Sequence, residues 1–149
     1  MSWYPHVTVA TVVEQDGKFL IVEEFDEAQS VVFNQPAGHL EMNESLVEAA
    51  VRETLEETGW LVEPTHIIDI SLYTSGKNNT TYFRTTFAAK ALHQVADAKL
   101  DEGIIQPRWL TLEELKSGRF CLRSPMVTYV IERYLNGIKQ PLDLVTYHS

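Results

Sequence analysis

The stretch from Gly38 to Trp60, GHLEMNESLVEAAVRETLEETGW, constrains this chain of 149 residues more than any other part of it. It places Glu53, Glu56 and Glu57 on one predicted helix. At about 100° of rotation per residue, Glu53 and Glu57 lie within about 40° of each other and Glu56 about 60° further round. The three carboxylates therefore project from one narrow wedge. Because hard cations such as Mg²⁺ prefer oxygen ligands, this wedge predicts a divalent-cation site.

Local signals predict both ends of this helix. Ser45 followed by Glu48 is a capping-box pair, and Gly59 stands where a left-handed residue ends a helix. Arg52 lies four residues from both Glu48 and Glu56, so it is predicted to pair with either one and to steady Glu56. The opposite face is predicted to pack on a core, and it consists of Val47, Val51, Thr54, Leu55 and Thr58.

A solvated acidic helix face is the competing interpretation of the three glutamates taken alone. The complete spacing argues against it, because G-x5-E-x7-R-E-U-x-E-E-x-G-U, where U is a bulky aliphatic residue, resembles the Nudix box. Thr54 and Trp60 occupy the two U positions here, and both are expected to affect packing more than metal binding. The matching positions are Gly38, Glu44, Arg52, Glu53, Glu56, Glu57 and Gly59.

Three strings extend the resemblance beyond the box: PHVTVATVV near the start, NQPAGHLE entering the box, and LRSP at Leu122 to Pro125. They are similar to the NudJ-type phosphatases, a subfamily that removes the terminal phosphate from hydroxymethylpyrimidine pyrophosphate, thiamine pyrophosphate and nucleoside di- or triphosphates. Another Nudix specificity, such as an ADP-sugar or oxidised-nucleotide pyrophosphatase, stays open. So does a nucleotide-binding sensor that does not hydrolyse, although the intact carboxylate set argues against it.

The resemblance also implies roles for residues of the box. Mg²⁺ is the expected metal, with Mn²⁺ as a substitute, and Arg52 would orient the carboxylates. Glu44 is usually structural in this family. Glycine at position 38 lets the backbone approach where a Cβ would intrude. The implied metal ligands are three carboxylates and one backbone carbonyl: Glu53, Glu56, Glu57 and Gly38.

The general base stays open between two carboxylates. The family draws it from the box or from a loop before a late strand, and here that loop contains Asp101 and Glu102. Glu102 precedes the strand predicted from Ile104 to Leu110 and resembles an additional carboxylate of several Nudix enzymes. Glu53 is the rival, and two solvated loop acids are the plainer alternative. Hydrogen-bond reach of the attacking water decides between them.

Residues outside the box are candidates for binding the substrate. Phe33 and Gln35 offer an aromatic face and an amide to a base, or serve core packing and turn bonding. Arg84 lies on the opposite strand face from Phe83 and is a candidate for pairing with a phosphate. Arg123 is a candidate for anion binding beside a predicted helix N-terminus, with a structural salt bridge as its alternative. Aromatic residues that would stack on a substrate ring or belong to the core are Tyr73, Tyr82 and Phe83.

Length and charge fit one enzyme domain, residues 1–149, large enough for a buried core. The net charge of −9 argues against binding a nucleic acid polymer or an anionic membrane. It also means that the small phosphorylated substrate implied by the resemblance must be drawn in by metal and local basic residues. Cys121 is the single cysteine and is predicted to be buried. The segment MSWYPHVTVATVV lacks the marks of a signal peptide, so a cytoplasmic location is expected. A monomer or weak homodimer is expected.

Turn signals and hydrophobic patterns predict the remaining elements. Strands at His6–Gln15 and Lys18–Glu24 are joined by an Asp16-Gly17 hairpin. Ser124 is the predicted N-cap of a late helix, with Pro125 as its first residue. The element order suggests a sheet covered on both faces, and the resemblance implies an α/β/α sandwich with a mixed sheet. The other predicted elements are strands at 31–34, 61–75, 80–92 and 104–110, and helices at 112–116 and 125–135.

Overall fold

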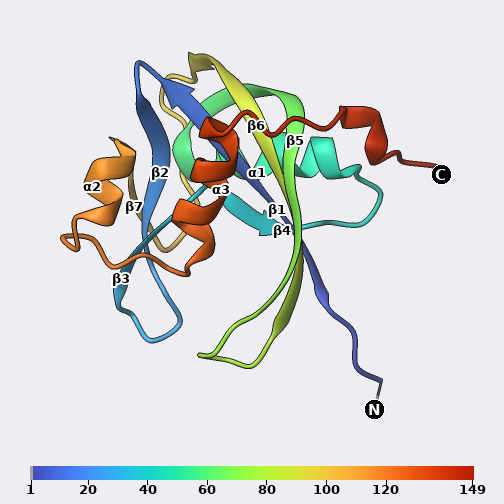
Figure 1. Ribbon diagram of the computed structural model, residues 1–149, viewed down its shortest axis with the longest axis horizontal. Coiled ribbons are helices and arrows are strands. Elements are labelled where there is room, and N and C mark those ends of the chain that lie inside the picture. Colours follow the sequence, from blue (N-terminus) through green and yellow to red (C-terminus); the bar gives the residue numbers. More distant parts are fainter. Residues whose placement is uncertain (1) are drawn as a thin grey trace.

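The computed structural model describes residues 2–149, whose strands form a seven-stranded mixed sheet (Figure 1). They are β1 (His6–Gln15), β2 (Lys18–Phe25), β3 (Val31–Asn34), β4 (Ala37–His39), β5 (Trp60–Thr74), β6 (Thr81–Gln94) and β7 (Ile104–Leu110). The order is β3-β2-β1-β6-β5, with β4 paired to β1 and β7 paired to β2. Only β1 and β6 are parallel neighbours within this range.

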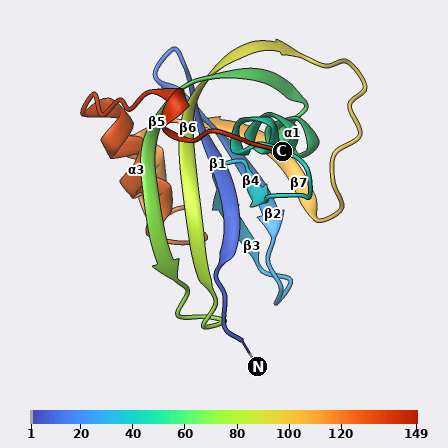
Figure 2. The ribbon, with the colours of Figure 1, turned by 90° about the vertical axis from the view of Figure 1, so that its right-hand side faces the viewer.

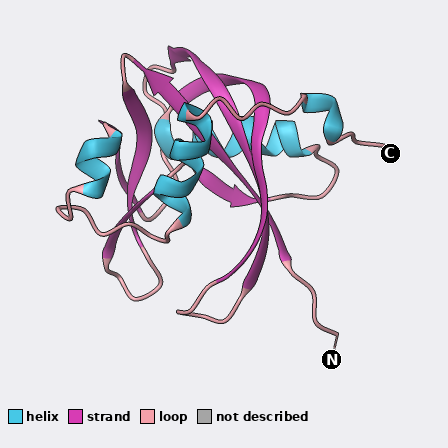
Figure 3. Cartoon of the chain, in the orientation of Figure 1, coloured by secondary structure: helices cyan, strands magenta, loops and turns pink. Residues whose placement is uncertain are grey.

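Helices cover both faces of this sheet. They are α1 (Leu46–Thr58), α2 (Leu112–Lys116) and α3 (Met126–Leu135), and a 3₁₀ turn, η1 (Leu142–Leu144), lies near the end of the chain. Figure 2 shows α1 and α3 on opposite sides of β1, β6 and β5, and Figure 3 shows the helices in cyan outside the magenta sheet. The predicted α/β/α sandwich with a mixed sheet is therefore confirmed. In residues 2–149 no helix has the length and apolarity needed to cross a bilayer.

The hairpin between β1 and β2 forms where the sequence predicts it. Asp16 and Gly17 both have positive φ, at 53° and 79°. A two-residue turn of this kind matches the twist of the flanking strands, which explains why Asp-Gly is favoured there. The register Gln15↔Lys18 then follows from the turn.

Small residues bring α1 close to the sheet. The Thr54 and Thr11 hydroxyls share a hydrogen bond of 2.8 Å, and the Thr54 hydroxyl also donates to the carbonyl of Ala50 at 2.8 Å. Of the predicted packing face, Thr54 and Thr58 are buried, Val47 packs against the core, and Val51 and Leu55 are half-buried. The buried residues of α1 are all small: Ala49, Ala50, Thr54 and Thr58.

Three further local predictions differ from the structure. β4 has no strong strand signal of its own, and it forms because β1 pairs with it, Val9 opposite Gly38. The helix α3 begins one residue later than predicted, with Pro125 as N-cap, although the Ser124 hydroxyl still accepts the Met126 N–H at 3.1 Å. Cys121 is exposed, because its neighbours on either side are the ones that pack against the core.

Candidate active site

A cavity of about 610 Å³ collects side chains from segments far apart in the sequence. α1 supplies carboxylates to its wall, β4 supplies backbone, and β6 and the segment before α3 supply one arginine each. Seven of the candidate residues named from the sequence line this cavity: Gly38, Glu53, Glu57, Tyr73, Tyr82, Arg84 and Arg123.

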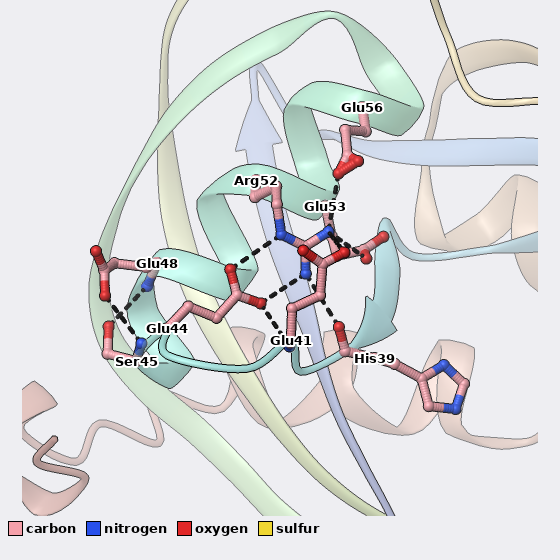
Figure 4. A network of polar contacts seen from close by, with 8 residues as sticks. All are labelled: His39, Glu41, Glu44, Ser45, Glu48, Arg52, Glu53 and Glu56. Carbon is pink, nitrogen blue, oxygen red and sulfur yellow. Dashed lines mark hydrogen bonds and ion pairs between the residues drawn. The ribbon is translucent and has the colours of Figure 1, made fainter. Parts of the chain in front are cut away.

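Arg52 holds three carboxylates together through hydrogen bonds beside this cavity and forms an ion pair with a fourth, Glu41, at 3.4 Å (Figure 4). Its Nε donates to Glu44 at 3.0 Å and its Nη2 donates to the second oxygen of Glu44 at 2.7 Å. Its Nη1 donates to Glu53 and to Glu56, at 2.8 Å each. The predicted alternative pairing with Glu48 is wrong, because that carboxylate accepts the N–H of the helix N-cap instead. The hydrogen bond from Arg52 lowers the pKa of Glu44.

Gly38 is fitted to the Glu53 carboxylate. A Cβ at position 38 would collide with that carboxylate, whereas the glycine leaves room for it. The Nη2 of Arg52 donates to the carbonyl of His39 at 3.0 Å, so one guanidinium joins α1 to β4. This packing agrees with the expectation that a glycine at position 38 lets the backbone come close to a side chain of the site.

Glu57 is a half-buried carboxylate with no cationic partner among residues 2–149. Among residues 2–149 its hydrogen bond comes from the backbone N–H of Ala37 at 2.9 Å. Burial raises the pKa of Glu57 to about 9, and the neighbouring charges of Glu24, Glu53 and Asp101 add to the shift. Burial also raises the pKa of Glu53, against the opposing effect of Arg52. Desolvation is the larger cause of both shifts, ahead of repulsion between neighbouring carboxylates.

The donors present fit a hard divalent cation. Carboxylate and carbonyl oxygens are the ligands that such cations prefer. A bound cation would also be the positively charged partner that the Glu57 carboxylate lacks among residues 2–149. Within residues 2–149, no three acidic, histidine or cysteine side chains converge on one point. The Glu53 and Glu56 carboxylates both accept hydrogen bonds from Arg52, whereas Glu57 accepts from the backbone of Ala37.

The raised pKa of Glu57 predicts a pH-dependent stability in metal-free protein. A group with a raised folded-state pKa binds more protons in the folded state, so the free energy of unfolding falls as pH rises from the unfolded pKa of about 4.3 towards about 9. Urea unfolding of wild type and Glu57→Gln in chelator, between about pH 5 and 9, measures this. We expect the wild type to lose stability relative to the variant as pH rises. A parallel pH dependence in the two proteins would contradict it.

Saturating Mg²⁺ at about pH 7.5 should raise the melting temperature of wild type more than that of Glu57→Gln, because a ligand of the native state stabilises it. An equal metal-induced shift in both proteins would place the stabilising ion elsewhere.

The loop before β7 contacts α1 through the backbone of Asp101. The Asp101 N–H donates to the carbonyl of Glu56 at 2.9 Å, which fixes this loop against α1. Burial and the charge of Glu56 raise the pKa of Asp101. Asp101 and Glu102 are both exposed, and neither lines the cavity. The structure therefore agrees with the plainer alternative of two solvated loop acids.

Two predicted substrate residues lie outside the cavity. Phe33 belongs to the core, with its ring centroid 4.8 Å from that of Phe120, so the interpretation that it presents a face to a base is wrong. Gln35 is 1% exposed. Its Nε2 donates to the Val127 carbonyl at 2.6 Å, and its Oε1 accepts from Arg84 at 3.1 Å. Both side chains therefore act through packing and support.

The two predicted arginines both line the cavity, but Arg84 is buried whereas Arg123 is ion-paired. Arg84 is buried, and burial lowers its pKa to about 10, with Asp69 opposing the shift. Arg123 forms ion pairs with Glu24 at 3.2 Å and with Glu27 at 2.9 Å. The salt-bridge alternative for Arg123 is thus present, and its partner carboxylates line the same cavity. The sequence offered no signal for these two glutamates, which resemble ordinary acids at a strand end.

The fold and the acidic helix define a family of hydrolases. The NUDIX domain matches residues 4–129, and the chain belongs to the Nudix family, as a phosphoanhydride hydrolase. The phosphatase NudJ of Escherichia coli strain K12 is 42% identical over 142 residues, which cover 95% of this chain and 90% of that protein. The phosphatase NudJ of Shigella flexneri has the same identity and coverage. A Nudix hydrolase structure from Nitrosomonas europaea has a TM-score of 0.94 and 42% identity, covering 97% of this chain and 98% of that chain.

Proposed function

We propose that this protein is a Mg²⁺-dependent phosphatase that removes orthophosphate from small diphosphate compounds. Hydroxymethylpyrimidine pyrophosphate, thiamine pyrophosphate and nucleoside di- or triphosphates are the proposed substrates. The 42% identity to proteins named phosphatase NudJ supports this reaction over the other Nudix specificities. The observation that carries the proposal is the cavity that joins Glu53 and Glu57 of α1 to Arg84 and Arg123.

The box residues have distinct proposed roles. Nudix hydrolases generally need a divalent metal, which neutralises phosphate charge and activates water when bound. Arg52 keeps the carboxylates of Glu53 and Glu56 in place through its Nη1. Arg123 supplies positive charge to the phosphate end of the substrate. The proposed Mg²⁺ ligands, with Mn²⁺ as a substitute metal, are Glu53, Glu56, Glu57 and the carbonyl of Gly38.

Glu53 is the proposed general base. Its side chain lines the cavity and burial raises its pKa, both of which favour accepting a proton from water. Glu102 is exposed outside the cavity. Glu102→Gln should then keep kcat within about twofold of wild type, and a loss of tenfold or more would assign the base to Glu102.

The bond that is broken distinguishes this proposal from its alternatives. With GTP or hydroxymethylpyrimidine pyrophosphate and Mg²⁺, the first product should be orthophosphate, because attack falls on the terminal phosphorus. Orthophosphate and pyrophosphate are measured separately over the first turnovers. Pyrophosphate as the main product from GTP would move the protein to a pyrophosphatase specificity, and nucleotide binding without any product would favour the sensor. The single domain, the cytoplasmic location and the monomer or weak homodimer stay predictions.

A further inference from the structure

Arg123 enters the cavity from a backbone that is fixed to the edge of the sheet. The Arg123 N–H donates to the carbonyl of Phe33 at 2.9 Å, and the Phe33 N–H donates to the carbonyl of Cys121 at 2.9 Å. These bonds pair the segment before α3 with β3, and they place Leu122 opposite Phe33. The position of the Arg123 side chain in the cavity wall is therefore set by strand-like pairing.

The guanidinium of Arg123 binds two carboxylates that differ in burial. Its Nη1 donates to Glu24 at 3.2 Å, and its Nη2 donates to Glu27 at 2.9 Å. The Glu24 side chain, on β2, is 15% exposed, whereas the Glu27 side chain, in the turn after β2, is 76% exposed. Breaking a buried ion pair leaves an uncompensated charge, whereas an exposed ion pair contributes little to stability. A ligand therefore displaces Glu27 from Arg123 more easily than Glu24.

The turn that carries Glu27 is held by bonds that do not involve Arg123. The Asp26 carboxylate accepts the N–H groups of Ala28 at 3.0 Å and of Ser30 at 2.9 Å. The Asp26 N–H donates to the Ser30 carbonyl at 2.9 Å. Movement of the Glu27 side chain away from Arg123 therefore leaves the backbone of the turn in place.

These ion pairs lie in the same cavity as the proposed metal ligands. Glu24, Glu27 and Arg123 line it together with Glu53 and Glu57. The Arg123 side chain is 32% exposed, so a phosphate can reach its guanidinium. An arginine commonly binds a phosphate through two parallel N–H groups. Here the Glu27 carboxylate occupies Nη2, one of the donors that a phosphate would use.

We propose that Glu27 is an internal competitor for Arg123, which an entering phosphate displaces and which returns to Arg123 as orthophosphate leaves. Glu24 is the positioning residue that keeps Arg123 in the cavity during the exchange. Occupation of Arg123 by Glu27 lowers the apparent affinity for phosphate by the fraction of protein in which Arg123 is free. The assignment rests on the proposed function in one respect, that the substrate places a phosphate on Arg123.

The first test measures binding without hydrolysis. Methylenediphosphonate, a diphosphate analogue whose CH₂ bridge resists hydrolysis, is titrated calorimetrically into the protein with Mg²⁺. Glu27→Gln should lower its Kd about two- to fivefold, the range expected for loss of an exposed ion pair. Glu113→Gln is the matched control, because it removes the same charge from an exposed side chain of α2 outside the cavity. It should leave the Kd unchanged. Unchanged or weaker binding by Glu27→Gln would overturn the assignment.

A double-mutant cycle shows whether the effect passes through Arg123. Arg123→Gln should raise the Kd about tenfold, and its amide can still donate to Glu24. Adding Glu27→Gln to Arg123→Gln should then change the Kd less than about 1.5-fold, because the competitor has no guanidinium to occupy. The same gain with and without Arg123 would show that Glu27 acts through its charge alone, which would also overturn the assignment.

The second test follows turnover of ADP. In Glu27→Gln the KM for ADP and the inhibition constant of orthophosphate should both fall about two- to fivefold, because substrate and product compete with the same carboxylate. An unchanged KM and inhibition constant, despite tighter binding of methylenediphosphonate, would overturn the exchange. If the wild type released no orthophosphate from ADP while the binding results held, the proposed function alone would be refuted.

Discussion

Replacing Glu57 by glutamine is expected to lower kcat at least about a hundredfold while the circular dichroism spectrum stays unchanged. Glutamine keeps the shape of the side chain and can still accept the N–H of Ala37, but it removes the anionic donor. Because Glu57 lines the cavity, the loss falls on the site. Glu56→Gln should have a similar effect. The measurement is steady-state hydrolysis at saturating substrate over a range of Mg²⁺ concentrations.

Glu48→Gln is the matched control for this prediction. It is the same substitution in the same helix, at a position whose side chain caps the helix N-terminus. Glutamine can serve the same capping role, so kcat should stay within about twofold of wild type. Near-full activity of Glu57→Gln at saturating Mg²⁺ would show that the proposed metal ligands are wrong.

Replacing Gly38 by alanine is expected to lower kcat about a hundredfold through a single added methyl group. That methyl would occupy the space of the Glu53 carboxylate, which must then swing away. The carboxylate is the end of a flexible side chain, so the fold should survive while the proposed base and metal ligand is displaced. Activity and urea unfolding are measured together, and a large loss of kcat should accompany a small loss of stability.

Gly76→Ala provides the comparison for Gly38→Ala. Gly76 lies in the β5–β6 hairpin, and a Cβ there would meet no other atom within 4 Å. Its kcat should match that of wild type. If Gly38→Ala also retained wild-type activity, the close packing of Gly38 on Glu53 would have no bearing on catalysis.

The sequence alone determined the features that depend on nearby residues. The capping box of Ser45 and Glu48 and the left-handed Gly59 are set by hydrogen bonds within one helix, so their spacing was sufficient. The Asp16-Gly17 turn fixed its hairpin for the same reason, since its backbone conformation is local. The acidic wedge of α1 and its match to the Nudix box also needed no information beyond 23 consecutive residues.

Only the tertiary structure decided which partners these residues meet. Arg52 lies at the right helical spacing for Glu48, yet it pairs with Glu44 because the loop before α1 folds back over it. Phe33 and Asn34 are neighbours in one short strand, but one enters the core and the other lines the cavity.

Arg84 is a strand residue with an ordinary pattern around it, and what sets its state is Gln35, 49 residues away. Burial raises the pKa of Glu57 in the same way, and the groups outside its own helix that act on it come from β2, β4 and the loop before β7. Helix periodicity fixes the direction in which a side chain leaves its own backbone. The local dielectric and the hydrogen-bond partners of that side chain depend on segments from other parts of the sequence that pack around it. This surrounding determines the chemistry of the side chain.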